Sequence, residues 1–116
     1  MAIVRGEAGE DAAMQLAEGA FISAVNVAEV VTKCVEQSFP EDVALRLIRS
    51  GGISVIAFDG DHALLAGQLR KKAPKGVLSL GDRACIATAI RAGATAVTAD
   101  RVWAGLDLPC PVELIR

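Results

Sequence analysis

Apolar runs and apolar positions at helical spacing alternate along the chain, separated by glycine, proline and short acidic segments. Apolar residues three and four positions apart indicate amphipathic helices, whereas continuous runs rich in β-branched residues indicate strands covered on both faces. Strands that alternate with helices predict a small three-layer α/β sandwich, in which helices flank a mostly parallel central sheet. Helices are expected at residues 7–18, 23–37, 40–50, 59–72 and 82–92, a helical turn at 101–106, and strands at 20–22, 53–58, 94–98 and 111–115.

Length and composition limit the class of protein. The 116 residues have the length of one domain, which we expect to span residues 1–116. No apolar stretch reaches the length of a membrane span, and no basic-then-apolar signal sequence opens the chain, so we expect a soluble, cytoplasmic protein that does not contact membranes. Three cysteines without metal-ligand spacing, Cys34, Cys85 and Cys110, are expected to be buried free thiols, which fits a reducing compartment.

Charge is distributed unevenly along the chain. Residues 1–61 carry four Lys or Arg against ten Asp or Glu, whereas residues 62–101 carry seven against two, and the whole chain has a net charge of −2. The two acids of the basic segment are Asp82 and Asp100. Isolated acids among basic residues suit a metal site within a surface that attracts phosphate; the alternative is an ordinary mixed-charge surface.

These two acids are predicted to lie near each other. Asp82 opens a helix three residues after Ser79, and Asp100 follows a buried strand. In an open parallel sheet, the carboxyl ends of strands and the starts of the following helices share one edge, and two carboxylates there suggest a divalent-cation site. Each acid also has a structural alternative: Asp82 as part of a capping box with Ser79, and Asp100 as the cap of a helical turn.

Glu29 is the third candidate acid. It lies on the side of its helix opposite the apolar stripe of Val27, Val30 and Cys34, and its alternative role is an exposed pair with Lys33. Ser23 and Asn26 begin the same helix, as caps or as polar contacts to a substrate. Arg83 and Arg101 flank two of the acids and either contact phosphate or balance charge.

Other features give weaker signals. The only histidine, His62, is expected on a helix surface, so histidine-based acid–base chemistry has little support. Asp59 and Asp61 are expected as helix-start acids, and Trp103 as a core residue. No glycine-rich phosphate loop is present. A basic cluster either binds a nucleic-acid backbone or complements the end of a helix: Arg70, Lys71, Lys72 and Lys75.

Three segments resemble PIN-domain proteins of the bacterial VapC toxin type: residues 22–30, 79–85 and 98–103. The resemblance extends over residues 2–116 and implies a small α/β fold with Mg²⁺- or Mn²⁺-dependent endoribonuclease activity. It also implies a type II toxin that a partner antitoxin protein inhibits, with RNA as substrate and a homodimer as the usual assembly. Carried over residue by residue, it makes Glu29, Asp82 and Asp100 the catalytic and metal-binding acids, with Ser79 and Thr98 as supporting neighbours.

One part of the family pattern departs from this sequence. The family opens with a central strand that ends in an aspartate, and residues 1–7 resemble instead the end of the helix that follows it. The first strand and its aspartate are therefore expected to be missing, and the gap to be tolerated through rearrangement, strand exchange or dimerisation. A competing function is a catalytically impaired module that binds an antitoxin or RNA. A small-molecule binding domain is less favoured.

Overall fold

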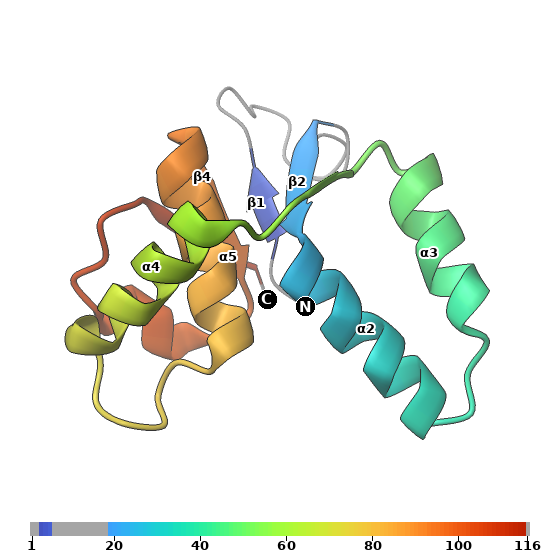
Figure 1. Cartoon of the computed structure of the whole chain (residues 1–116), viewed down its shortest axis with the longest axis horizontal. Helices are drawn as coiled ribbons and strands as arrows, with labels where there is room; N and C mark the ends of the chain where they lie inside the picture. The colour runs from blue at the N-terminus through green and yellow to red at the C-terminus, as the bar shows by residue number, and fades with distance from the viewer. Residues whose placement is uncertain (1–2, 6–18, 116) are drawn as a thin grey trace.

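A five-stranded mixed sheet forms the centre of the fold in the computed structural model, which describes residues 3–5 and 19–115 (Figure 1). The strand order is β3-β2-β1-β4-β5. β2 and β3 are parallel, as are β4 and β5, whereas β1 pairs antiparallel with both β2 and β4, so four of the five strands run the same way. This arrangement confirms the predicted α/β class. The strands are β1 Ile3–Arg5, β2 Ala20–Ser23, β3 Ser54–Ile56, β4 Thr95–Thr98 and β5 Val112–Leu114.

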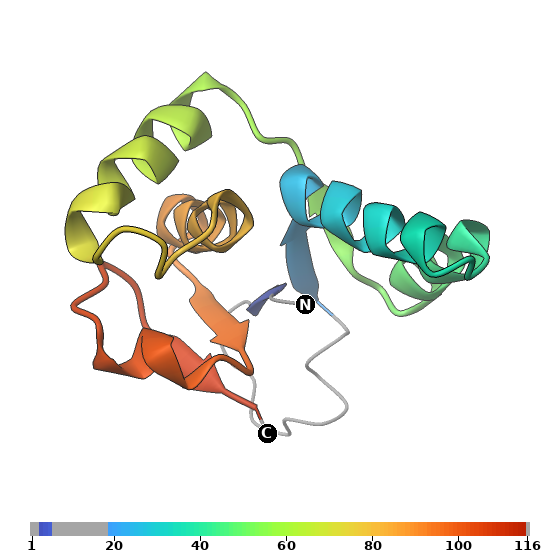
Figure 2. The same cartoon turned by 90° about the horizontal axis from the view of Figure 1, so that it is seen from below.

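The helices form close to the positions that the apolar pattern predicts. They are α2 Ala24–Glu36, α3 Glu41–Ser50, α4 Gly60–Gln68 and α5 Leu80–Ala92, with 3₁₀ helices η1 Leu69–Lys72 and η2 Arg101–Gly105. Seen from below, α5 lies centrally beside the sheet, with α4 on one side of it and α2 on the other (Figure 2). α3 packs on α2, and this pair of helices extends away from the sheet. The helix expected at residues 7–18 lies outside the described residues.

The middle position of the sheet is filled, contrary to the expectation that its strand would be missing. β1 occupies this position, and its Val4 pairs with Phe21 of β2 and with Ala96 of β4. Residues 3–5 are therefore a strand and not the end of a helix. The physical reason is that β2 and β4 would otherwise bury unpaired backbone groups. Val4 is β-branched and fully buried, so it supplies both the ladder and core contacts that this position requires.

The hydrophobic core lies between the sheet and α5. It contains Trp103, which is 1% exposed, as expected for a core residue. Three of the seven buried residues of α5 are alanines, and their small side chains let the helix lie close to the strands. The other large fully buried apolar side chains are Ile22, Ile86, Val4 and Val97.

Two local expectations are wrong. The run at residues 53–58 was expected to be covered on both faces, but β3 is an edge strand, and Val55 is 51% exposed. His62 was expected on a helix surface and is instead buried. Its Nδ1 lies 2.7 Å from Oδ1 of Asp59, the residue that caps α4, and its ring lies 6.2 Å from that of Phe58, so a local polar partner compensates for its burial.

The cysteines agree with the expectation of free thiols. Cys34 and Cys85 are buried, and Cys110 is half-buried. Burial raises the pKa of the Cys85 thiol to about 12. Within the described part of the chain, no helix is long and apolar enough to cross a membrane.

Candidate functional site

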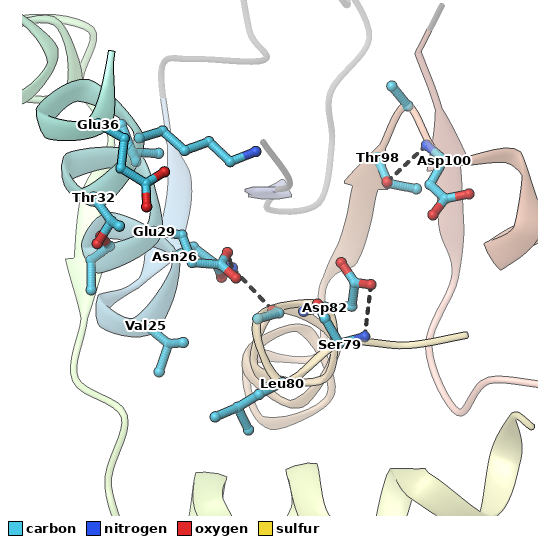
Figure 3. A pocket seen from close by; sticks show the side chains of 15 residues that line it. Val25, Asn26, Glu29, Thr32, Glu36, Ser79, Leu80, Asp82, Thr98 and Asp100 are labelled. Atoms are coloured by element: carbon cyan, nitrogen blue, oxygen red, sulfur yellow. Dashed lines mark hydrogen bonds between the residues drawn. The ribbon is translucent and has the colours of Figure 1, made fainter. Parts of the chain in front are cut away.

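The three acids that the sequence singles out line one cavity of about 850 Å³ (Figure 3). Glu29 comes from α2, Asp82 from the first turn of α5, and Asp100 from the residues after β4. β2 and β4 run in the same direction on either side of β1, so their carboxyl ends, at Ser23 and Thr98, lie at the same edge of the sheet. Asp82 and Asp100 thus lie at the edge predicted for them, and Glu29 lines the same cavity without forming a three-acid cluster with them.

Asp82 has a structural role as well as a place in the cavity. Its Oδ2 accepts a hydrogen bond from the backbone N–H of Ser79 (3.0 Å), and its own N–H donates to Ser79 Oγ (3.0 Å). These two bonds form the capping box that was the alternative interpretation of this acid. The box uses one carboxylate oxygen, and Oδ1 accepts no hydrogen bond from any residue that the structure describes. Asp82 therefore caps the helix and keeps an oxygen available toward the cavity.

Asp100 likewise caps a helix and lines the cavity. Its Oδ1 accepts from the N–H of Val102 (3.0 Å) and caps η2, as the alternative interpretation predicted. Its own N–H donates to Oγ1 of Thr98 (3.0 Å), a residue that is 4% exposed. Thr98 thereby fixes the backbone from which the carboxylate projects, which is consistent with its expected supporting role.

Glu29 lies on the side of α2 that faces the start of α5 (Figure 3). Its Oε1 accepts a hydrogen bond from Nδ2 of Asn26 (3.1 Å), and the same nitrogen donates to the carbonyl oxygen of Gly81 (3.0 Å). A methyl group built on Gly81 would overlap the Glu29 carboxylate, so the glycine leaves the space that this carboxylate occupies. The hydrogen-bond partner of Glu29 is therefore Asn26, and not Lys33 as in the alternative interpretation; Lys33 lines the same cavity. Sequence reasoning gave Gly81 no role, because nothing local links it to Glu29.

The carboxylate oxygens that line the cavity are of the ligand type that divalent cations such as Mg²⁺ prefer. Mg²⁺ prefers oxygen ligands, keeps several waters, and binds through one or two carboxylates together with substrate phosphates. Asp82 and Asp100 each offer an oxygen that accepts no hydrogen bond from the described residues. Within residues 3–5 and 19–115, no three His, Cys, Asp or Glu side chains lie close enough together to hold one ion. The residues therefore fit a cation that is bound by few carboxylates and completed by water and substrate, not by a closed protein cage.

The two arginines beside the acids differ in their surroundings. Arg83 donates from Nη1 to the carbonyl oxygen of Ala66 (3.0 Å) and from Nε to that of Leu78 (3.4 Å), so it joins α5 to the end of α4. It is engaged with the backbone and is a poor candidate for phosphate contact. Arg101 is exposed beside Asp100 and makes no side-chain hydrogen bond or ion pair with the residues that the structure describes.

The family of the chain agrees with this geometry. The PIN domain family matches residues 1–107, so the chain belongs to the PIN-domain family. PIN domains are generally nucleases and typically use divalent metals, and the fold is therefore of a nuclease type. Comparison with curated proteins and with solved structures gave no significant match.

Proposed function

We propose that this protein is a metal-dependent endoribonuclease that hydrolyses RNA phosphodiester bonds, and that it is the toxin of a type II toxin–antitoxin pair. The observation that carries the proposal is the placement of Glu29, Asp82 and Asp100 around one cavity at the edge where β2 and β4 end. Membership of a family of nucleases supports the reaction class.

Glu29, Asp82 and Asp100 are the acids of the cavity among which one or two would hold Mg²⁺ or Mn²⁺, with water and substrate completing the coordination. Such an ion, when bound, polarises a phosphate oxygen and lowers the pKa of a bound water. The chain's own contribution is to keep the three carboxylates in place: the capping box fixes Asp82, Thr98 fixes the backbone at Asp100, and Asn26 fixes Glu29.

The charges around the cavity fit a polyanionic substrate. Carboxylates alone repel phosphate, so RNA binding there requires a cation or nearby basic side chains. Residues 62–101, which contribute Asp82 and Asp100, carry seven Lys or Arg against these two acids. Of the basic residues close to the acids in sequence, Arg83 donates to backbone carbonyls, Arg101 is exposed beside Asp100, and Lys33 lines the cavity.

An antitoxin protein and a second copy of the chain are the partners in this proposal. Apolar side chains are exposed on α2 and α3 and on the segment between them, among them Val35 (58%), Phe39 (52%) and Leu47 (66%). Contiguous exposed apolar patches are typical of surfaces that contact other proteins, and we propose that these side chains form part of one. α2 and α3 extend away from the sheet (Figure 2).

A second candidate function is a catalytically impaired module that still binds RNA or an antitoxin. The observation that favours it is that, in the described part of the chain, no three acids gather closely enough to hold one ion. A protein with this function would bind RNA or the antitoxin without cleaving RNA.

Incubation of the purified protein with fluorescently labelled RNA distinguishes the two candidates. We expect cleavage with Mg²⁺ or Mn²⁺ and none with EDTA. Glu29→Gln, Asp82→Asn and Asp100→Asn should each lower the rate by at least about 100-fold, since each removes a carboxylate charge from the cavity. Asp42→Asn is the matched control, because Asp42 is an exposed acid of α3 paired with Arg46. Binding by wild type without cleavage would support the impaired module, and neither binding nor cleavage would overturn the nuclease and any role in binding RNA.

A further inference from the structure

Asn26 is a buried polar side chain at the wall of the cavity. It is 3% exposed and lies in the first turn of α2. Its Nδ2 donates to Oε1 of Glu29, within the same helix, and to the carbonyl oxygen of Gly81, in the first turn of α5 (Figure 3). Both protons of this nitrogen are therefore used, one inside α2 and one across to the neighbouring helix.

The orientation of the Asn26 amide follows from its surroundings. Both neighbours of Nδ2 are oxygen acceptors, so a reversed amide would place Oδ1 against two other oxygens. With Nδ2 facing these two acceptors, Oδ1 is buried and has no hydrogen-bond partner among the described residues. A buried acceptor without a partner is unfavourable, so a side chain that only filled space would serve better here as an apolar residue. The donor function of Nδ2 is what an apolar residue cannot replace.

Gly81 completes the arrangement from the other side. Its carbonyl receives the Asn26 bond, and its lack of a side chain leaves room for the Glu29 carboxylate. Asp82 follows Gly81 directly, so the bond that holds Gly81 also holds the turn that carries Asp82. One amide thus sets the position of Glu29 relative to Asp82.

We propose that Asn26 is a positioning residue, which holds the Glu29 carboxylate against the start of α5 and thereby sets the affinity of the cavity for a divalent cation. The consequence for cation affinity rests on the proposed function, whereas the link between Asn26 and Glu29 does not. Residues that orient metal ligands typically affect metal affinity by about 10–100-fold when they are replaced.

The first test measures Mn²⁺ binding without RNA, from the electron paramagnetic resonance signal of the free ion. Asn26→Ala should weaken binding by about tenfold or more. Asn26→Asp, which keeps the shape but replaces the donor with an acceptor, should not restore it. Ile86→Val is the stability control: it trims a fully buried core residue of α5 away from the cavity, so it should lower Tm and leave Mn²⁺ affinity unchanged. Wild-type affinity in Asn26→Ala would overturn the cation part of the proposal.

The second test needs neither metal nor RNA. Thermal unfolding of Asn26→Ala, Glu29→Ala and the double variant forms a cycle that reports whether the two side chains act together. We expect the change in Tm of the double variant to differ from the sum of the single changes, and additive changes would overturn the proposal. If wild type neither binds Mn²⁺ nor cleaves RNA, the proposed function fails, and this cycle still decides the link between Asn26 and Glu29.

Discussion

Asp82 provides a test that separates its role in metal binding from its role in folding. If the cavity binds a cation, Mn²⁺ should stabilise the folded state, because the unfolded chain does not gather the carboxylates. At a Mn²⁺ concentration about ten times its Kd, the stabilisation is about 1.4 kcal/mol. For 116 residues the unfolding entropy is about 0.24 kcal/mol/K, so we expect Tm to rise by about 6 °C.

Asp82→Asn should abolish most of this rise while leaving the helix start intact. An asparagine oxygen can still accept from the N–H of Ser79, so the main loss without metal is the favourable charge at the start of α5, about 0.3–1 kcal/mol. That loss corresponds to about 1–4 °C in Tm. With Mn²⁺, the variant should gain less than about 2 °C.

Ser79→Ala is the matched comparison, since it damages the cap and keeps the carboxylate. Loss of the Ser79 hydroxyl removes the acceptor for the N–H of Asp82 and should lower the metal-free Tm by about 4 °C, for a typical cap of about 1 kcal/mol. Its Mn²⁺-dependent rise should persist, because the backbone N–H of residue 79 still holds Asp82. Differential scanning fluorimetry with and without EDTA measures both quantities. A full Mn²⁺ shift in Asp82→Asn would refute the assignment of Asp82 as a ligand.

Three further predictions concern other parts of the structure. Gly81→Ala should lower kcat/KM for RNA by more than about tenfold, because the added methyl group displaces the Glu29 carboxylate. Hydrogen bonds from His62 lower the pKa of the Asp59 carboxyl from 3.8 to about 2. This carboxylate therefore stabilises the folded state above pH 3.8, and that stabilisation is lost as the pH falls toward 2. Asp59→Asn should flatten this part of a curve of Tm against pH. Burial raises the pKa of Cys85 to about 12, so in the native protein iodoacetamide should alkylate the less buried Cys110 first, as mass spectrometry of peptides would show.

Matched variants give each of these predictions a control. Gly67→Ala places a methyl group in open space on α4 and should leave cleavage unchanged; an equal loss in both glycine variants would contradict the steric argument. Asp61→Asn removes a neighbouring exposed acid of α4 and should keep the acid-dependent change in Tm. Labelling of Cys85 as fast as Cys110 would mean that the core around α5 opens readily.

Local patterns predicted much of the site. Ser23 and Ser79 each cap the helix that the sequence assigned to them, because a cap depends on a side chain and an N–H two or three residues away. Asp82 and Asp100 reach one cavity because strands that run in the same direction end at one edge. For both acids the structural and the functional interpretations are compatible, because one carboxylate oxygen caps a helix and the other stays available to the cavity.

The sequence by itself thus determined the helices, their caps and the edge at which the acids gather, because these follow from contacts within a few residues and from the order of the elements. Only the tertiary structure decided that β1 fills the middle of the sheet antiparallel to its neighbours, that His62 is buried, and that Asn26 joins Glu29 to Gly81. These features depend on partners that are distant in sequence or on the packing of whole elements. The periodicity of apolar residues within a segment does not specify which strand will pair with a given strand, or which helix will start next to a given side chain.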